Sequence, residues 1–274
     1  IGEYSSTLFA CLARQRGPCM KLFFNRIGEG RPLIILHGLF GLGDNWATIA
    51  RQLATHGFAC YLVDQRNHGR SPHSPDFSYP LMSEDLFELL QDQRISQPIL
   101  LGHSMGGKTV IRFALDHAGI AIKLVVVDIA PRYYPPHHQA VLAALHAVDF
   151  DQVRKRKEVE DMLRNALHEE ATVQFLLKNL YWVSDDRLAW RFDLDTLSRS
   201  IDSVGDAMPN DRVIETPTLF VRGERSGYIT AGDEVEISRH FSTASVVTVP
   251  AAGHWVHAEN PKGFLEAVLP FLNS

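Results

Sequence analysis

The stretch that decides the fold is ILLGHSMGGK at residues 99–108. Its leading apolar residues predict a buried strand, and the residues from Lys108 onward predict a helix. Between them Gly102, Ser104 and Gly106 fit Gly-x-Ser-x-Gly, a sharp strand-to-helix turn that exposes a serine hydroxyl above a sheet. Small residues on both sides of the serine allow the backbone to make that turn. The pattern occurs by chance in about one chain in ten of this length, so the prediction depends on the flanking strand and helix. A glycine-rich turn that merely contains a serine stays open as the alternative.

Five further apolar runs have the same organisation, because each is continuous and strand-sized. They span residues 33–36, 59–63, 124–127, 218–221 and 246–249. Continuous rather than alternating apolar runs are typical of parallel strands covered on both faces. Helix-length segments lie between the runs, at 45–56, 81–92, 105–117, 232–241 and 261–272. This alternation predicts an α/β fold with a mostly parallel, doubly wound sheet.

The alternation is interrupted once, between residues 131 and 213. No comparable strand is expected there, and amphipathic stretches take its place at 139–148, 159–167 and 172–179. We therefore expect a helical cap over residues 131–213. The remaining segments, 20–130 and 214–274, would form the α/β core.

The first residues need separate treatment. A short apolar patch at 8–13 is followed by Arg14 and Arg16, whereas a secretory signal places its positive charges first. We interpret residues 1–19 as a leader or an added upstream segment and exclude them from the fold.

Composition excludes several classes of protein. The 274 residues are 45% hydrophobic and 22% charged, and 27 basic against 32 acidic residues give a net charge of −5. This balance argues against a nucleic-acid partner, and no apolar run approaches the length of a membrane span. Cys11, Cys19 and Cys60 fit neither a zinc site nor a disulfide framework, so we expect no metal and a reducing, cytoplasmic location. Oligomeric state is not determined by the sequence.

A serine hydroxyl is a poor nucleophile unless a base removes its proton. Among the 13 histidines, His254 follows the last apolar run, at the sheet edge where Ser104 is expected. We expect His257 to be structural, because a metal pair of His254 with His257 lacks a third ligand. Position therefore selects His254 as the base.

The segment HGLFG at residues 37–41 follows the apolar run 33–36. A glycine turn there can expose the N–H of Leu39 (or Phe40), which with the N–H of Met105 would hold an oxyanion. The alternative, that the two glycines only make a tight turn, stays open.

Five segments together resemble the α/β-hydrolase superfamily and, more narrowly, the bacterial YbfF-type esterases and the abhydrolase domain 11 proteins. They are HGLFG at 37–41, DQRNHGRS at 64–71, GHSMGGK at 102–108, DIAP at 128–131 and GHWVHAE at 253–259. The resemblance extends from Lys21 to the C-terminus. It implies an α/β-hydrolase fold and cofactor-free hydrolysis of carboxylic esters or thioesters. In such proteins Asp64 and Arg66 would brace the nucleophile turn.

The triad acid is where this chain departs from the commoner superfamily pattern, which places an aspartate in a Gly-x-x-Asp turn after the seventh strand. Here the turn reads GERS at 223–226, so Ser226 stands in the place of the aspartate. Glu224 and Asp128 are the candidate carboxylates. Asp128 ends the run 124–127, and its DIAP segment is similar to the one that supplies the acid in YbfF-type esterases. We predict Asp128, with a mere turn-capping role as the alternative.

These residues predict a serine esterase acting on small to medium acyl esters, with Ser104, His254 and Asp128 as the catalytic residues. We expect substrate contacts from Phe40, His103 and Trp255 and, in the cap stretch 175–182, from Phe175 and Trp182. Ligand pockets are mostly apolar, so a cap needs an apolar underside. Carbon–carbon bond hydrolases and cofactor-free haloperoxidases of the same fold keep a serine and stay open, as does a non-catalytic scaffold. A small-molecule ester is the expected partner.

Overall fold

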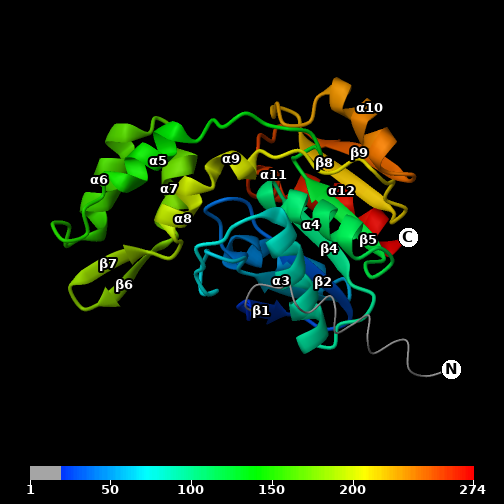
Figure 1. Ribbon diagram of the computed structural model, residues 1–274, viewed down its shortest axis with the longest axis horizontal. Coiled ribbons are helices and arrows are strands. Elements are labelled where there is room, and N and C mark those ends of the chain that lie inside the picture. The colour runs from blue at the N-terminus through cyan, green and yellow to red at the C-terminus, as the bar shows by residue number, and fades with distance from the viewer. Residues whose placement is uncertain (1–19) are drawn as a thin grey trace.

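The computed structural model describes residues 20–274, so the predicted leader 1–19 lies outside the described residues. Its centre is a seven-stranded sheet of order β1-β3-β2-β4-β5-β8-β9 (Figure 1). Neighbouring strands are parallel except β1 and β3, which pair antiparallel. The strands are β1 (Phe24–Ile27), β2 (Arg31–Leu36), β3 (Phe58–Val63), β4 (Ile99–His103), β5 (Lys123–Val127), β8 (Thr218–Gly223) and β9 (Ala244–Val249).

The inner strands are continuous apolar runs because helices cover both faces of the sheet. In β2, Ile34 and Leu36 belong to one buried cluster, whereas Leu33 and Ile35 belong to the other. The first cluster includes residues of α3 (Tyr79–Asp92), α4 (Met105–Asp116) and α10 (Ala231–His240). The second includes residues of η2 (Gly43–Trp46), α2 (Ala47–Ala54), α11 (Val256–Glu259) and α12 (Pro261–Asn273). The predicted doubly wound α/β sheet is confirmed.

One strand of the sheet was not expected from the sequence. Strand β1 has the sequence FNRI, and none of its four residues is fully buried. It lies at the edge of the sheet, where a strand needs no continuous apolar run.

The insertion between β5 and β8 forms a cap, drawn in green to yellow on the left of Figure 1. It contains α5 (Gln139–His146), α6 (Arg156–Ala166), α7 (Glu170–Leu177), α8 (Leu194–Arg199) and α9 (Ile201–Val204). It also contains an antiparallel hairpin of β6 (Leu180–Ser184) and β7 (Arg187–Trp190), which was not expected from the sequence in the helical cap. Strand β6 is mostly exposed and therefore lacks the apolar pattern of a core strand.

The two connections between core and cap are joined to each other. Tyr134 N–H donates to Gly205 O at 2.8 Å, and Met208 N–H donates to Pro131 O at 2.7 Å. Lys108 of α4 is buried beneath them, and its Nζ donates to Gly205 O at 2.8 Å and also to Asp206 O. Burial lowers the pKa of Lys108 to about 7. The cap is thereby attached next to the helix that follows Ser104.

None of the helices within residues 20–274 combines the length and hydropathy needed to cross a membrane.

Candidate active site

Ser104 occupies the turn between β4 and α4. Its backbone is left-handed, with φ 52° and ψ −118°, and its N–H donates to Val127 O at 2.9 Å. A Cβ atom on Gly102 would lie 2.1 Å from Gly106 O, and one on Gly106 would lie 2.5 Å from Leu36 O. Both glycines of the motif are therefore required by close backbone approach. Strained backbone of this kind is typical of functional sites, and here it presents the serine to a cavity.

His254 lies in the loop between β9 and α11, with its ring against Asp128. The Nδ1 atom is 2.7 Å from Asp128 Oδ2. With a carboxylate as acceptor, Nδ1 carries the proton and Nε2 can accept one. Asp128 follows β5, is fully buried and has a φ of 51°. Its second oxygen, Oδ1, accepts from Gly223 N–H at 3.1 Å, so both oxygens of the carboxylate are hydrogen-bonded.

Ser226, which replaces the superfamily aspartate, contacts the acid instead of supplying it. Its Oγ lies 2.5 Å from Asp128 Oδ2, the oxygen that also faces His254. The other candidate acid, Glu224, accepts from Ala251 N–H at 2.8 Å. The structure thus brings Asp128 and not Glu224 to the histidine. Sequence reasoning missed this contact of Ser226, although a hydroxyl residue at the expected acid position was the available signal.

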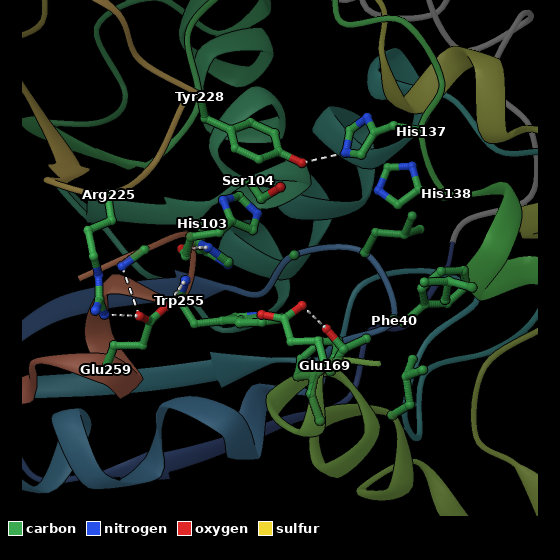
Figure 2. A pocket seen from close by; sticks show the side chains of 18 residues that line it. Phe40, His103, Ser104, His137, His138, Glu169, Arg225, Tyr228, Trp255 and Glu259 are labelled. Atoms are coloured by element: carbon green, nitrogen blue, oxygen red, sulfur yellow. Dashed lines mark hydrogen bonds and ion pairs between the residues drawn. The ribbon is translucent and has the colours of Figure 1, made fainter. Parts of the chain in front are cut away.

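Tyr228 is a second neighbour of His254 that the sequence did not single out. The two rings stack with centroids 4.0 Å apart and planes inclined by 20°. The Tyr228 hydroxyl is 2.6 Å from His137 Nε2, which belongs to the first connection to the cap. Figure 2 shows Tyr228 and His137 on the same side of Ser104.

Core and cap enclose a cavity of about 570 Å³ that Ser104 and His254 both line. Four residues expected to contact substrate, Phe40, His103, Phe175 and Trp255, lie in its wall (Figure 2). The remaining lining residues are Gly38, Leu39, His137, His138, Val141, Glu169, Thr172, Leu176, Arg225, Tyr228, Gly253 and Glu259. The volume falls within the range of small-molecule pockets.

Trp182 is the exception, and its predicted place in the pocket has to be corrected. Its side chain is 50% exposed and does not line the cavity. Helix α7 ends at Leu177, and the chain then enters the β6–β7 hairpin, which lies at the far end of the cap in Figure 1. Phe175, still on the helix, faces Trp255 of the core with ring centroids 5.6 Å apart.

The oxyanion donors can be distinguished by their hydrogen bonds. Phe40 N–H donates to His68 Nε2 at 3.1 Å and is therefore occupied. Within the described residues the N–H groups of Leu39 and Met105 have no hydrogen-bond partner. Met105 begins α4, where an N–H has no acceptor inside the helix. A recess of about 20 Å³ beside Ser104 is lined in part by Leu39 and Met105, which is room for about one oxygen atom.

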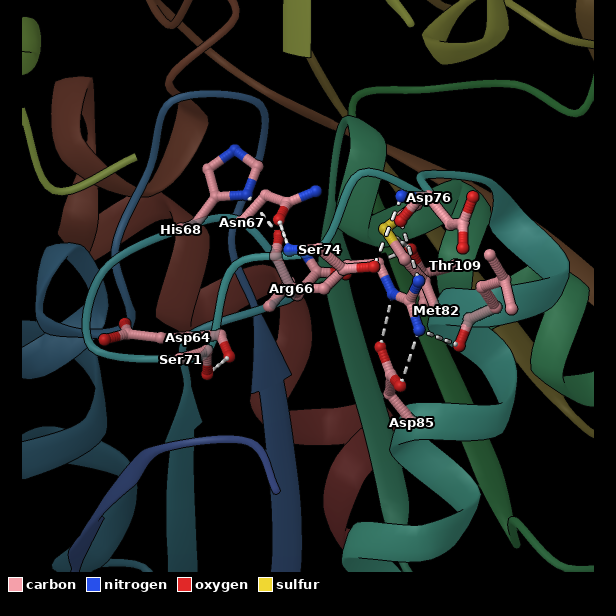
Figure 3. A network of polar contacts seen from close by, with 12 residues as sticks. Asp64, Arg66, Asn67, His68, Ser71, Ser74, Asp76, Met82, Asp85 and Thr109 are labelled. Carbon is pink, nitrogen blue, oxygen red and sulfur yellow. Dashed lines mark hydrogen bonds and ion pairs between the residues drawn. The ribbon is translucent and has the colours of Figure 1, made fainter. Parts of the chain in front are cut away.

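The segment 64–71 is bonded to the loop after β2, at His37 and Gly43, rather than to the turn at Ser104. Arg66 forms a buried ion pair with Asp85 of α3 at 2.6 Å (Figure 3). The Asp64 carboxylate accepts from the N–H groups of Gly43 and Arg70. None of these hydrogen bonds reaches the Ser104 turn, so the expectation for Asp64 and Arg66 is corrected.

Gln65 makes the connection instead. Its N–H donates to His37 Nε2 at 3.0 Å, and its side-chain amide donates to His37 O at 2.7 Å. Thr109 of α4 donates to Gln65 Oε1 at 3.0 Å. Gln65 therefore joins the loop after β2 to the helix after Ser104.

Two further histidines pack beneath the site. His257 stacks on Trp46 with ring centroids 3.7 Å apart, and burial lowers its pKa to about 3. His103 Nε2 lies 2.8 Å from His254 O, and burial holds the pKa of His103 well below its usual value. The part of the chain that the structure describes contains no group of three His, Cys, Asp or Glu side chains able to hold a metal.

Comparison with known proteins agrees with this geometry. The model of the "Alpha/beta hydrolase family" matches residues 33–267. The "sn-1-specific diacylglycerol lipase ABHD11" of Mus musculus is 40% identical over 247 residues, which cover 88% of this chain and 80% of the mouse protein. "Esterase YbfF" of Escherichia coli (strain K12) is 35% identical over 245 residues, covering 88% of this chain and 93% of that protein. A solved structure described as "Marine microorganism esterase" has a TM-score of 0.89 and 42% identity, and covers 92% of this chain and 99% of its own. This chain therefore belongs to the α/β-hydrolase family, within the branch that contains esterases and lipases.

Proposed function

We propose that this α/β hydrolase cleaves carboxylic esters through an acyl-enzyme, with Ser104 as nucleophile, His254 as base and Asp128 as the triad acid. The proposal depends above all on one observation, the 2.7 Å contact between His254 Nδ1 and buried Asp128 at the cavity that Ser104 also lines. A carboxylate on Nδ1 holds the imidazole in the tautomer whose Nε2 accepts a proton, and it stabilises the imidazolium that forms.

The reaction would proceed in two halves. Ser104 Oγ attacks the ester carbonyl carbon while His254 Nε2 takes the hydroxyl proton, and the N–H groups of Leu39 and Met105 hold the negative oxygen. The tetrahedral species collapses, and His254 protonates the departing alcohol. Water then attacks the acyl-enzyme with His254 again as base, which releases the carboxylic acid and restores Ser104. Ser226 Oγ and Gly223 N–H keep the Asp128 carboxylate oriented throughout.

The cavity supports acyl groups of small to medium length. Its cap side carries an apolar part, formed by Val141 of α5 and by Phe175 and Leu176 of α7, beside the polar His137, His138, Glu169 and Thr172. Phe40 and Trp255 add apolar surface from the core. Apolar surfaces from both parts favour an acyl chain between them, because its burial removes apolar area from water. At about 570 Å³ the space has to hold the acyl chain and the alcohol together. The esterase and lipase descriptions of the relatives support the same substrate class.

Replacing the nucleophile tests the proposal. Ser104→Ala should lower kcat on p-nitrophenyl butyrate by at least about 10⁴-fold, since a triad acts as a unit. A fluorophosphonate probe should label the wild-type protein at Ser104 and should not label the variant. A series from acetyl to palmitoyl esters, with acyl-CoA and diketone substrates beside it, would define the substrate class.

Two results would reject the proposal. Near-normal activity of Ser104→Ala, with contaminating esterases removed, would rule out this nucleophile. Absence of labelling and of activity on every ester would favour a non-catalytic scaffold, and turnover of diketones alone would favour carbon–carbon bond hydrolysis.

A further inference from the structure

The core and the cap each hold one of the two peptide groups that flank the Cα atom of Phe40. Phe40 follows Leu39 in the loop after β2, is buried and has a φ of 57°, a left-handed conformation unusual for a bulky residue. Its N–H donates to His68 Nε2 at 3.1 Å, and its C=O accepts from Asn179 Nδ2 at 2.7 Å. His68 belongs to the core, whereas Asn179 belongs to the cap and lies 139 residues further along the chain.

His68 is suited to its half of this clamp. Its Nδ1 lies 2.8 Å from Arg66 O, so Nδ1 carries the proton and Nε2 is left to accept from Phe40. Burial holds the pKa of His68 well below its usual value, which keeps the ring neutral. Figure 3 shows His68 within the segment 64–71.

Asn179 supplies the other half, from the bend between α7 and β6. It is fully buried, and its backbone O accepts from Arg191 N–H at 2.9 Å. Its side-chain Oδ1 is buried without a hydrogen-bond donor among the described residues. The contact with Phe40 O fixes the orientation of the amide, because turning the amide over would place Oδ1 against that carbonyl oxygen. A buried polar atom without a partner is unfavourable for stability, which favours a functional reason for an amide at this position.

We infer that Asn179 is a positioning residue of the oxyanion hole, so that the cap shapes the catalytic centre as well as the pocket. His68 fixes the N–H of Phe40, and Asn179 fixes its C=O. With both groups of Phe40 fixed, the preceding residue, Leu39, would keep its N–H directed toward Ser104. This inference rests on the proposed acyl-enzyme mechanism.

Neighbouring contacts support a joint between the cap and this loop. Phe192 of the cap lies with its ring centroid 5.0 Å from that of Phe40. The next residue, Asp193, donates its N–H to Asn67 O at 2.9 Å, immediately before His68. The cap therefore supplies one of the two groups that hold Phe40, Asn179, and also bonds the residue before the other, His68.

The expected signature of Asn179 is a loss of transition-state binding. A ground-state ester needs the oxyanion donors little, whereas the tetrahedral species needs them fully aligned. Misplacement of a catalytic group by about 1 Å costs on the order of 100-fold in rate. Loss of the amide should therefore lower kcat and leave KM nearly unchanged.

The test uses Asn179→Ala, which removes the amide, and Asn179→Leu, which keeps nearly the same size and has no hydrogen-bond donor. Leu163→Ala is the control, because Leu163 is fully buried in α6 and its loss perturbs cap packing. Each variant is assayed for kcat and KM on p-nitrophenyl butyrate, for melting temperature, and for inhibition by a butyl trifluoromethyl ketone. That ketone adds to Ser104 and places a negative oxygen in the hole. Ester affinity in a Ser104→Ala background reports ground-state binding.

Both Asn179 variants should lose about 10- to 100-fold in kcat, with KM and ester affinity within about twofold. Affinity for the trifluoromethyl ketone should fall by the same factor as kcat. Leu163→Ala should lower the melting temperature with little change in that affinity.

Unchanged kcat and unchanged ketone affinity in either folded variant would overturn the role of Asn179. So would a loss of kcat that follows melting temperature alone, as in the Leu163 control. Asn179→Leu decides the matter if Asn179→Ala does not fold. Failure of the mechanism itself looks different, because Ser104 would then not react with the fluorophosphonate in the wild-type protein.

Discussion

The sheet edge of the core and the underside of the cap line the same cavity, but they hold their residues in different ways. At the sheet edge, Ser104 and Asp128 directly follow strands and have left-handed backbones, with φ of 52° and 51°. Their N–H groups donate to the neighbouring strands, at Val127 O and Val221 O. In the cap, Phe175 reaches the cavity from an eight-residue helix.

This difference in how the residues are held suggests different roles for the sheet edge and for the cap residues that line the cavity. Strained backbone persists only where the surrounding structure holds it. At the sheet edge, hydrogen bonds to the neighbouring parallel strands hold the backbones of Ser104 and Asp128. The cap is instead joined to the core by apolar packing and by hydrogen bonds, among them those at Gly205, Pro131, Phe40 and Asn67. We therefore expect changes to the triad at the sheet edge to affect kcat most. Changes to the cap residues that line the cavity should affect the choice of acyl group, whereas Asn179, which bonds Phe40, should affect kcat.

Asp128 gives the strongest test of the sheet edge. Asp128→Asn should keep the fold and lower kcat by about 10⁴-fold, because the imidazole loses its orienting carboxylate and the charge that stabilises its protonated form. Steady-state kinetics and a melting curve would check both. Glu224→Gln is the matched control, since that carboxylate accepts from Ala251 N–H, and it should stay within a fewfold of wild type. An inactive Glu224→Gln beside an active Asp128→Asn would assign the acid to Glu224.

Ser226 tests how far the activity depends on the hydrogen bond that the Asp128 carboxylate accepts from a neighbouring hydroxyl. Ser226→Ala removes the 2.5 Å hydrogen bond to Asp128 Oδ2 and should lower kcat by about tenfold, the order expected for one hydrogen bond to a charged group. Ser226→Thr retains the hydroxyl and should recover most of the rate. Equal rates for the alanine and threonine variants, whether both high or both low, would show that the hydroxyl itself is not responsible.

Phe175 and Trp182 form a matched pair within the cap. Phe175→Ala enlarges the cavity and should shift the ratio of kcat/KM for octanoyl over acetyl esters by about tenfold, the lower end of the range for a small change in an apolar pocket. Trp182→Ala should leave that ratio unchanged, because Trp182 is half exposed on the hairpin. A uniform loss across chain lengths that follows melting temperature would assign Phe175 to packing alone.

His257 gives the smallest expected effect, on stability rather than on rate. Burial lowers its folded-state pKa to about 3, so the unfolded chain binds the extra proton between about pH 3 and 6.5. The stability from its neutral form is complete above pH 6.5 and is lost as pH falls toward 3. At pH 5 the loss is about 2 kcal/mol, or several degrees in melting temperature.

The difference in melting temperature between His257→Phe and wild type should therefore be several degrees more favourable to the variant at pH 5 than at pH 7.5. The phenyl ring can keep the stacking on Trp46, and the imidazole Nδ1 has no hydrogen-bond partner among residues 20–274. His56→Ala, at an exposed position, serves as control and should show no such gain. Parallel curves of melting temperature against pH for wild type and His257→Phe would contradict the prediction.

Local sequence was sufficient for six of the seven strands of the sheet and for the candidate catalytic residues. Central strands covered on both faces must be continuously apolar, so β2, β3, β4, β5 and β8 could be located from their apolar runs. Edge strand β9 also contains such a run, whereas edge strand β1 does not. Ser104, Asp128 and His254 each follow a strand with such a run. Carboxyl ends of parallel strands meet at one edge, so their proximity could be predicted before any coordinates were known.

What could not be predicted depends on contacts between distant segments. The Asn179 amide and the Phe40 carbonyl are 139 residues apart, and the Ser226 hydroxyl is 98 residues from Asp128. No local periodicity encodes such pairs. Trp182 shows the same limit, because an aromatic residue five positions beyond the end of α7 faces the pocket or the solvent according to how the chain turns. Only the packing of cap on core decided that Phe175 lines the cavity, that Trp182 does not, and that a cap amide holds the oxyanion loop.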